Sequence, residues 1–464
     1  MQYTLNIHKR NYTSYSLISD TDTITLNDPA LISGMFHGDI VVYEQGIIKL
    51  VSSNLPKYIA GELELYSKYT FKPNSRGIPS YVFTPIDYRY PKFLVNSSMK
   101  KNHKTNLFIL IEFKNWTENP IFPIGIIYKT IGSIYDKTAL QEIIINKYYL
   151  DNNKIKLDLK GVTAKFESAK LQTKKHTKFC GEIISIDPKG CTDIDDAFTI
   201  NDDVNILSLN IHISDVYYLI SELGFIDKIS NITSIYLSDS VKHMLPNIIS
   251  SGLGSLLENE DRFMLTLSIK YNKQNNDIVS IKFENYIGTI TKNYSYENYP
   301  RKIRKYYKCI ENIYKIITDR DIVIDDSHKF IEALMVIYNT YFSKNVNIDG
   351  LQIYRTQPKK TYNSKGVDPD LEKFIKLITS NSAVYSTLKE GHASLGIDNY
   401  THVTSPLRRL VDLINQEIYH TSNSNIIQRI PLEDINNTNK RLKKCYRDIN
   451  KLSLAHDVYN SECY

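Results

Sequence analysis

The sequence predicts a multidomain protein in which an all-β N-terminal part precedes a larger α+β domain. Its 464 residues exceed the length of one ordinary domain. Short apolar runs broken by Pro, Gly, Asn and Lys fill the first 165 residues, and helical patterns dominate only after strand-like segments beyond residue 180. Strands that come early and helices that come late within one stretch are typical of an α+β domain.

The strand-like segments of the first 165 residues have the spacing expected of small barrels or sandwiches. They are GDIVVYEQGIIKLV (38–51), YIAGELELY (58–66), NLFILIEF (106–113) and FPIGIIYKTIG (122–132). One helix is expected over 137–150. The polar and basic stretch FESAKLQTKKHTKF (166–179) is the best candidate for a linker to the next domain.

The part that follows residue 180 contains both strand and helix patterns. Strands are predicted over 206–215 and 262–271. Helices are predicted over 327–345, 366–379, 405–420 and 434–457.

Composition excludes several classes of protein. Hydrophobic residues make up 42% and charged residues 23%, a balance typical of soluble domains. No apolar run reaches the roughly 18 residues that a membrane span needs, and the N-terminus lacks the apolar core of a signal peptide. The five cysteines are odd in number and form no CxxC pair, which argues against a disulfide framework or a zinc ribbon. We therefore expect no membrane partner and an intracellular location, in the cytoplasm or the nucleus.

The formal net charge of +6 lies entirely in residues 1–170, because the rest of the chain is balanced. A basic excess on one part of a protein is a weak indication of a polyanionic partner. A solvated surface explains the same excess, and on charge alone we favour that interpretation.

The sharpest local feature is a group of four aspartates that follows a strand-like run. Its members are Asp187, Asp193, Asp195 and Asp196. Carboxylates packed this closely repel one another and raise each other's pKa, so a cation is expected among them. Oxygen-only ligands suit hard cations such as Mg²⁺, with Mn²⁺ as a substitute, and do not suit zinc.

Three interpretations of this acidic group compete. A calcium loop of the EF-hand type is excluded because the positions after Asp193 lack the required glycine and the final glutamate. A solvated acidic turn is the ordinary explanation, but the apolar Ile186 and Ile194 indicate partial burial, where unpaired charge is costly. The third is a phosphodiesterase site, in which two Mg²⁺ ions about 4 Å apart activate a water and stabilise the leaving oxygen.

A second feature is the segment NYTHVTSPLRRLVDLIN (399–415). Thr404 or Ser405 is a natural N-cap, and Pro406 suits the first position of a helix.

Arg408 and Arg409 would then fall in the first turn, where cations oppose the helix dipole, so helix stability does not explain them. Arginines beside a helix N-terminus form a good phosphate site. The alternative is an exposed i,i+4 ion pair between Arg408 and Asp412.

Several motifs together resemble those of the RNB (RNase II) exoribonuclease family, and within it the branch of the eukaryotic exosome's catalytic subunit. The two main signatures are IDPKGCTDIDDAF (186–198) and YTHVTSPLRRLVDLIN (400–415). Between them, in the family's order, lie LSLNIHISDVYYLI (207–220), SIYL (234–237), MLP (244–246), YSYE (294–297), IEALM (331–335) and HASLG (392–396). Near the N-terminus, HGDIVVYE (37–44), TPIDYRYPKFLV (84–95) and FKNWTENPIFPIGIIYKTIGSI (113–134) resemble the family's cold-shock-type domains.

The resemblance implies a domain order. Two cold-shock-like OB barrels would occupy residues 1–75 and 76–165, and an α+β RNB catalytic domain would occupy 166–464. The family's C-terminal RNA-binding barrel and the PIN domain of some members have no counterpart in this sequence, so we expect neither.

The resemblance also implies an activity. The family hydrolyses RNA from the 3′ end and releases nucleoside 5′-monophosphates. In this chain Asp187, Asp193, Asp195 and Asp196 match the acids that hold Mg²⁺, and Asp195 matches the acid on which cleavage most depends. Arg408 matches the arginine that neutralises charge on the scissile phosphate.

Four further residues are expected to contact RNA by the same resemblance. Tyr236 and Tyr296 match aromatics that clamp the terminal nucleotides, and Glu332 matches an acid near the terminal riboses. Arg409, beside Arg408, is expected to contact RNA as well. For both tyrosines the alternative is core packing. Tyr446 stands where the family has a glutamate, which puts one 3′-end contact in doubt.

These expectations leave alternatives open. A catalytically inactive RNA-binding or scaffold protein of the same fold is the second hypothesis, and a nuclease acting on DNA is the third. The expected partner is single-stranded RNA. The protein would work either within an exosome-like complex or as a monomer.

Overall fold

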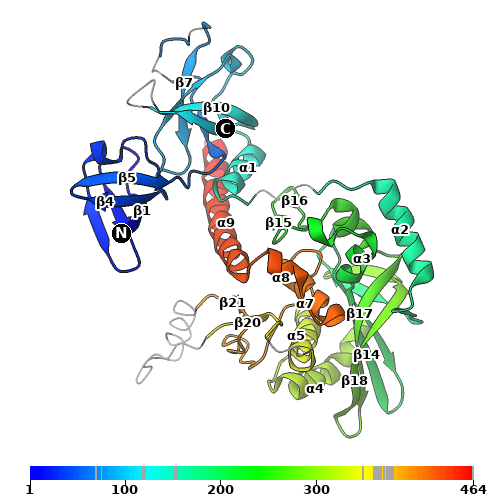
Figure 1. Ribbon diagram of the computed structural model, residues 1–464. Helices are drawn as coiled ribbons and strands as arrows, with labels where there is room; N and C mark the ends of the chain where they lie inside the picture. Colours follow the sequence, from blue (N-terminus) through cyan, green and yellow to red (C-terminus); the bar gives the residue numbers. More distant parts are fainter. Residues whose placement is uncertain are drawn as a thin grey trace. The chain divides into compact units, whose positions relative to one another are not determined.

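The computed structural model describes residues 1–67, 71–74, 76–116, 122–150, 155–346, 350–358, 368, 371 and 381–461 (Figure 1). The chain forms two compact units. The first comprises Met1–Asp151 together with Asn439–Tyr464, and the second comprises Asn152–Thr438. The predicted multidomain arrangement is thus confirmed, although the two units share the C-terminal helix.

The N-terminal β-module is a five-stranded antiparallel sheet of order β3-β2-β1-β4-β5. Its strands are β1 (Gln2–Ile7), β2 (Tyr15–Ile18), β3 (Thr23–Leu26), β4 (Ile40–Glu44) and β5 (Ile47–Ser52), with a 3-10 helix η1 (Pro29–Ile32) after β3. Alternation along β1 buries Tyr3, Leu5 and Ile7, which form the module's core with residues of β2 and β4. This strand order is that of a partly open OB-type barrel.

The second β-module is a closed barrel of order β10-β8-β7-β6-β9. Its strands are β6 (Ile59–Leu63), β7 (Ser80–Pro85), β8 (Phe93–Asn96), β9 (Leu107–Asn115) and β10 (Ile124–Ser133), and α1 (Lys137–Lys147) follows them. The parallel pairing of β8 with β10 closes the barrel. Gly61 on β6 is required, because a Cβ there would overlap the Phe83 ring and the Thr84 carbonyl.

The boundary between the two β-modules differs from the predicted one at residues 75 and 76. Strand β6 begins at Ile59 and belongs to the closed barrel, so the connection between the modules is the short stretch 53–58. The apolar run 58–66 contains no turn signal that would assign it to one module or the other. Its place in the second module follows only from the pairing of β6 with β7 and β9.

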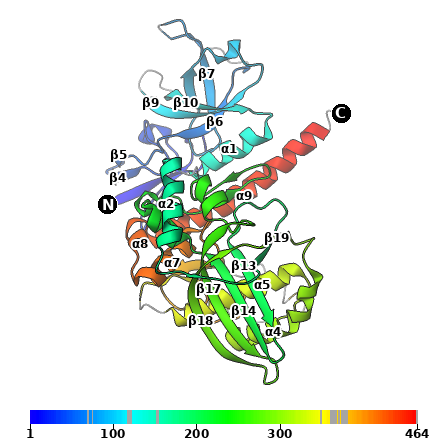
Figure 2. The ribbon, with the colours of Figure 1, turned by 90° about the vertical axis from the view of Figure 1, so that its right-hand side faces the viewer.

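The second unit is built on a seven-stranded sheet of order β11-β18-β17-β14-β13-β12-β19 (Figure 2). Its strands are β11 (Thr177–Lys178), β12 (Ile184–Asp187), β13 (Asp196–Asp202), β14 (Ile206–Ser214), β17 (Asp261–Asn272), β18 (Asp277–Thr289) and β19 (Lys292–Ser295). Strands were predicted at the positions of β14 and β17. Alternate residues of β14, including Leu207, Leu209 and Ile211, pack against α4 (Tyr307–Thr318) and α5 (Ser327–Asn345) in one core.

A second core lies among the remaining helices. They are α2 (Leu159–Gln172), α3 (Val216–Leu223), α7 (Leu410–Thr421), α8 (Asn425–Arg429) and the start of α9 (Leu432–Ser461). The helices predicted over 327–345 and 434–457 are confirmed by α5 and α9, whereas nearly all of the helix predicted over 366–379 lies outside the described residues. No helix within the described ranges combines the length and apolarity needed to cross a membrane.

Two sequence predictions were wrong. The stretch 166–179 is not a linker, because its first half continues α2 and its second half adds β11 to the sheet. Val162, Phe166 and Ala169 are buried on α2. Most of the lysines of the stretch follow the end of α2 at Gln172. The helix predicted to begin near residue 405 begins at Leu410.

A buried polar cluster joins three distant parts of the second unit. Asp215 accepts hydrogen bonds from the Tyr218 backbone N–H, where it caps α3, and pairs at 2.9 Å with His176 Nε2 and His420 Nε2. Burial alone would raise the pKa of Asp215, but its contacts with His420 and His176 hold it below its usual range. Asp215 therefore fastens the end of β14 to α7 and to the segment before β11.

Substitution Asp215→Asn is expected to lower the free energy of unfolding of the second unit by about 3 kcal/mol, because it breaks a buried charged network. The pKa of Asp215 is depressed in the folded state, so its stabilisation is present above the unfolded value of about 4 and lost below it. Urea unfolding at neutral pH and at several pH values below about 4 measures this, with Asp203→Asn on an exposed hairpin as the control. Equal loss in both variants would contradict the assigned role of Asp215.

Candidate active site

The four aspartates lie at one end of the central sheet. Asp187 ends β12 and Asp196 begins β13, its antiparallel neighbour, so the loop 188–195 brings the acids to the same edge. The loop turns at Gly190, whose φ of 82° is in the left-handed region that favours glycine. Cys191 N–H donates to the Pro188 carbonyl across this turn at 3.0 Å.

Apolar anchors hold the acidic loop against the protein. Ile194 and Ala197 are buried in a small core with Leu256 and Met264. The Ile194 N–H donates to Ser255 Oγ at 2.9 Å, and its carbonyl accepts from the Leu256 N–H at 3.0 Å. Asp193 and Asp195, on either side of Ile194, are only 7% and 3% exposed. The loop is therefore not a solvated acidic turn.

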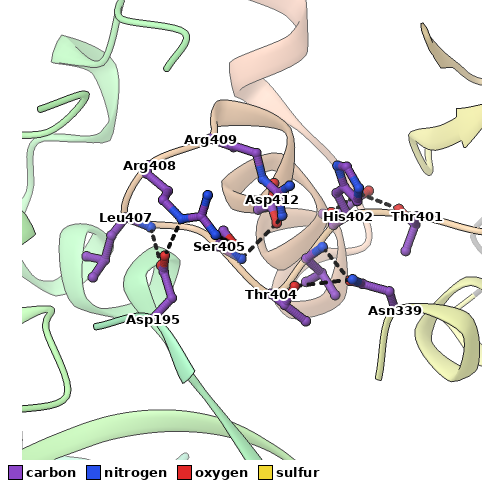
Figure 3. A network of polar contacts seen from close by, with 12 residues as sticks. Asp195, Asn339, Thr401, His402, Thr404, Ser405, Leu407, Arg408, Arg409 and Asp412 are labelled. Atoms are coloured by element: carbon purple, nitrogen blue, oxygen red, sulfur yellow. Dashed lines mark hydrogen bonds and ion pairs between the residues drawn. The ribbon is translucent and has the colours of Figure 1, made fainter. Parts of the chain in front are cut away.

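Asp195 connects this loop to the arginine motif (Figure 3). Its Oδ1 accepts a hydrogen bond from the Leu407 backbone N–H at 2.9 Å, and its Oδ2 accepts one from Arg408 Nε at 3.1 Å. Arg408 Nη2 also donates to Ser405 Oγ at 2.8 Å. The Arg408 side chain stays 42% exposed, so part of the guanidinium faces outward from its buried partner.

The arginine motif is a turn that precedes α7, and not the first turn of the helix. Asp412 accepts hydrogen bonds from the Ser405 N–H and from Arg409 Nη2, both at 2.8 Å. The alternative of an i,i+4 ion pair between Arg408 and Asp412 is therefore wrong, since Asp412 pairs with Arg409 and Arg408 pairs with Asp195. Arg409 is directed inward by this pair, and whether it contacts RNA stays a prediction.

Tyr236 comes to Asp193 from a small hairpin formed by β15 (Ile235–Tyr236) and β16 (Val241–Lys242). Its hydroxyl donates a hydrogen bond to Asp193 Oδ2, while its side chain remains 39% exposed. His243 Nδ1 lies 3.8 Å from the same oxygen. We did not predict His243 from the sequence, although its position directly before the MLP motif offered a signal. The hydroxyl end of the Tyr236 ring is therefore fixed, and the ring is not packed in the core.

Tyr296 lies beside Asp187 because β19 runs parallel to β12. The Tyr296 N–H donates to the Asp187 carbonyl at 3.1 Å. One face of its ring is stacked on His328, with centroids 3.8 Å apart, and the side chain packs at the margin of the main core. Both the predicted position near the acids and the alternative of core packing therefore apply to Tyr296.

The other predicted site residues lie apart from these contacts. Glu332 on α5 is half exposed and forms an ion pair with Lys329 Nζ at 2.7 Å. Tyr446 lies on α9, in the stretch of that helix that belongs to the first unit. The expected role of Glu332 near the terminal riboses stays a prediction, and so does the loss of a 3′-end contact where Tyr446 replaces the family's glutamate.

The electrostatics of the acidic loop favour a bound cation. Burial, with a contribution from Asp193, raises the pKa of Asp187 to about 6. Burial raises the pKa of Asp195 to about 7 although Arg408 opposes the shift, and burial with Asp187 and Asp195 raises that of Asp196. Asp187 Oδ2 is buried and has no hydrogen-bond partner among the described residues. Ionised together, these groups would repel one another unless a cation lay among them.

The residues around the acidic loop suit Mg²⁺, which does not require a preformed cage of protein ligands. Within the described part of the chain, no three His, Cys, Asp or Glu side chains converge as a ready ligand set. Mg²⁺ is usually held by one or two carboxylates together with waters and substrate phosphates, so it does not need such a set. The unpartnered Asp187 Oδ2 and the all-oxygen donors around it are suited to that kind of binding.

Fold and site together define a protein with two OB-type modules and an α+β domain that carries an acidic site facing an arginine. The RNB domain model matches residues 178–312 and 310–425, and the model of the Dis3-like cold-shock domain 2 (CSD2) matches residues 80–148. The chain belongs to the RNB family.

Relatives and solved structures agree with this assignment. Ribonuclease R of Mycoplasmopsis pulmonis is 27% identical over 321 residues, which are 52% of this chain and 44% of that protein. Exosome complex exonuclease RRP44 of Mus musculus is 25% identical over 229 residues, 47% of this chain and 23% of that protein. The chain thus spans less than half the length of these two relatives.

Two solved structures share the fold. Mycoplasma genitalium RNase R in complex with ribose methylated single-stranded RNA superimposes with a TM-score of 0.75 at 18% identity, over 99% of this chain and 87% of that chain. Yeast Ssd1, described as a pseudonuclease, gives a TM-score of 0.62 at 15% identity, over 96% of this chain and 72% of that chain. At these identities the likeness concerns the fold alone.

The raised pKa values predict how stability depends on pH in the absence of metal. A carboxyl with a raised folded-state pKa lowers stability as pH rises from its unfolded value near 4 through its folded value, here about 6 for Asp187. Substitution Asp187→Asn should therefore stabilise the chelator-treated protein at pH 8, by on the order of 1 kcal/mol, and change little at pH 4. Thermal unfolding at both pH values measures this, and Asp203→Asn serves as the control. A stability difference that is the same at pH 4 and pH 8 would contradict the prediction.

Proposed function

We propose that this chain is a metal-dependent 3′→5′ exoribonuclease that hydrolyses single-stranded RNA to nucleoside 5′-monophosphates. The observation that carries the proposal is the buried contact of Asp195 with Leu407 N–H and Arg408 Nε, which joins the acidic loop to the arginine motif. Bound metal ions and a positioned cation both promote phosphodiester hydrolysis, and this contact makes the acids that would hold the metal neighbours of such a cation.

Asp187, Asp193, Asp195 and Asp196 would hold Mg²⁺, with Mn²⁺ as a substitute. The bound ions would supply an activated water and stabilise the leaving oxygen. The protein's own part is to present the carboxylates ionised and in position: Asp193 is fixed by the Tyr236 hydroxyl, and Asp195 by the Leu407 N–H.

Arg408 would stabilise the negative charge that develops on the scissile phosphate. Its Nε is used by Asp195 and its Nη2 by Ser405, which fixes the plane of the guanidinium before the substrate arrives. Because a positioned cation need not reorganise during the reaction, it stabilises the transition state more than a mobile one does.

Tyr236 would stack on a base near the 3′ end. Its hydroxyl is fastened to Asp193 while its side chain remains 39% exposed, so the base would lie at a defined place relative to the carboxylates. Stacking does not read sequence, which suits an enzyme that degrades RNA of any sequence. Tyr296 would be the second aromatic that clamps the terminal nucleotides, and Glu332 would lie near the terminal riboses. Arg409 would contact RNA in addition to its ion pair with Asp412.

Single-stranded RNA is the proposed partner, and the protein would act as a monomer or within an exosome-like complex. Its location in the cytoplasm or the nucleus also stays a prediction. The alternative is an RNA-binding protein of the same fold without activity, and the fold of yeast Ssd1 makes this alternative concrete.

Substitution Asp195→Asn is expected to reduce mononucleotide release to below about one hundredth of the wild-type rate, because it removes a ligand charge beside Arg408. The assay uses RNA labelled along its whole length, so that released mononucleotides carry the label, with Mg²⁺ or with EDTA, and a matched DNA oligonucleotide.

The control is Asp203→Asn, which should keep the wild-type rate. If wild-type protein released no metal-dependent product while still binding RNA, the inactive RNA-binding alternative would hold. Equal cleavage of RNA and DNA would contradict the substrate assignment.

Substitution Tyr236→Ala is expected to weaken binding of single-stranded RNA about tenfold in EDTA, because it removes a stacking ring. Tyr236→Phe keeps the ring and should bind within about twofold of wild type, yet it should slow hydrolysis because Asp193 loses its hydrogen bond. Fluorescence anisotropy of a labelled oligonucleotide measures the affinity. If Phe and Ala variants bound equally weakly, the hydroxyl rather than the ring would be the RNA contact.

A further inference from the structure

The second β-module carries a pair of stacked tyrosines that the proposed catalytic chemistry does not use. The ring centroids of Tyr58 and Tyr128 are 3.8 Å apart, and the ring planes are inclined by 21°. Tyr58 directly precedes β6, and Tyr128 lies on β10. Ile59 and Ile127, their chain neighbours, both pair with Ile111 of β9. Strand pairing therefore brings the two rings of this tyrosine pair together across β9.

A β-bulge presents Tyr128 on the surface of the barrel. Two residues of β10, Tyr128 and Lys129, follow Ile127 where the paired strand β9 advances by only one residue. Tyr128 and Lys129 are consequently both exposed, although neighbours on a regular strand point to opposite faces. Lys129 is paired with Glu142 at 2.7 Å, so the aromatic ring is the group that stays available for a ligand.

Tyr128 keeps one face of its ring open. Tyr58 covers the other face, yet 53% of Tyr128 remains exposed. Ile126, two positions earlier on β10, is 52% exposed as well. Neighbouring exposed apolar side chains indicate an interaction site more strongly than isolated ones do.

The charges near the tyrosine pair suit a polyanion. Lys57 is exposed, and its Nζ lies 5.2 Å from the centre of the Tyr58 ring. On β9, Lys114 is exposed, whereas Glu112 is partly buried. The two lysines outnumber the acid, and the first 170 residues hold the whole basic excess of the chain. Exposed rings next to cations are the combination by which proteins bind single-stranded nucleic acids.

The shape of the surface favours a nucleobase over a protein partner. Because Tyr58 supports the Tyr128 ring from behind, the ring offers a fixed flat face. Every base has a π-face that stacks on such a ring. A stable protein partner would need a contact of about 800 Å² on each side, of which the two exposed apolar side chains of β10 supply only a small part.

We propose that Tyr128, supported by Tyr58, stacks on a base of single-stranded RNA and that Lys57 contacts a neighbouring phosphate. OB-type barrels usually hold nucleic acid on their second and third strands, which are β7 and β8 here. The tyrosine pair lies on the first and fifth strands, and in a different unit from the acidic loop. It is therefore an additional RNA contact, and the choice of RNA as the strand rests on the proposed function.

Substitution Tyr128→Ala is expected to weaken binding of single-stranded RNA by the full chain in EDTA about tenfold, because it removes the stacking face. Tyr128→Phe keeps the ring and should bind within about twofold of wild type. Tyr128→Leu keeps apolar area without an aromatic face, so it should bind as weakly as Tyr128→Ala. Fluorescence anisotropy of a labelled oligouridylate measures these affinities, and circular dichroism verifies that each variant is folded.

The matched control is Tyr88→Ala, which should bind RNA as wild type does. Tyr88 lies in the loop between β7 and β8, is 59% exposed, and has no ring contact among the described residues. Substitution Lys57→Gln tests the phosphate contact. It should reduce the slope of log affinity against log salt concentration by about 0.7, the share of one phosphate on a single strand.

A double variant tests whether the contact is separate from the one proposed for Tyr236. The losses of Tyr128→Ala and Tyr236→Ala should multiply to about one hundredfold, since effects at distant independent sites add as free energies. A double variant that binds no more weakly than either single variant would mean that both rings serve the same contact, and it would overturn the proposal.

The possible results also separate this proposal from the exoribonuclease proposal. Unchanged affinity in Tyr128→Ala, or wild-type affinity in Tyr128→Leu, overturns the stacking contact even if Mg²⁺-dependent hydrolysis is normal. Weaker binding of Tyr128→Ala in a protein that hydrolyses no RNA supports the contact and overturns only the exoribonuclease. In an active protein, Tyr128→Ala should raise KM about tenfold and leave kcat unchanged, because the ring binds RNA away from the acids.

Discussion

The buried carboxylate of Asp195 is the contact on which the rest of the site depends. Asp195 lies in the loop between β12 and β13. Its carboxylate accepts hydrogen bonds from the Leu407 N–H and Arg408 Nε, more than two hundred residues later in the chain. A buried charge is stable only when it is paired and hydrogen-bonded. The sheet and the turn before α7 therefore have to lie at one fixed position relative to each other. The arginine motif and the acidic loop are neighbours because of this electrostatic requirement.

The turn that carries Arg408 is held from two further directions. From α5, Asn339 accepts a hydrogen bond from the Val403 N–H and donates to Thr404 Oγ1 (Figure 3). From α7, Asp412 accepts from the Ser405 N–H and from Arg409. Few torsions in this turn are therefore free, and the exposed part of the Arg408 guanidinium has one defined direction. Such preorganisation is what electrostatic stabilisation of a transition state needs.

The two β-modules show a different use of charge. The net charge of +6 lies in the first 170 residues, whereas the residues after 170 are balanced. General attraction of a polyanion and reading of one base are separate tasks, because long-range charge has no base selectivity and hydrogen-bond donors do.

The amino-acid sequence by itself determined the fold class and the four aspartates with Arg408, because strand alternation and clustered motifs are local patterns. The prediction of a linker over 166–179 was wrong, because the burial of Phe166 depends on a packing partner that composition does not reveal. Only the tertiary structure decided that Arg408 pairs with Asp195 and that His243 lies near Asp193. Each of these depends on residues far apart in the chain, and their distance is fixed by packing rather than by spacing.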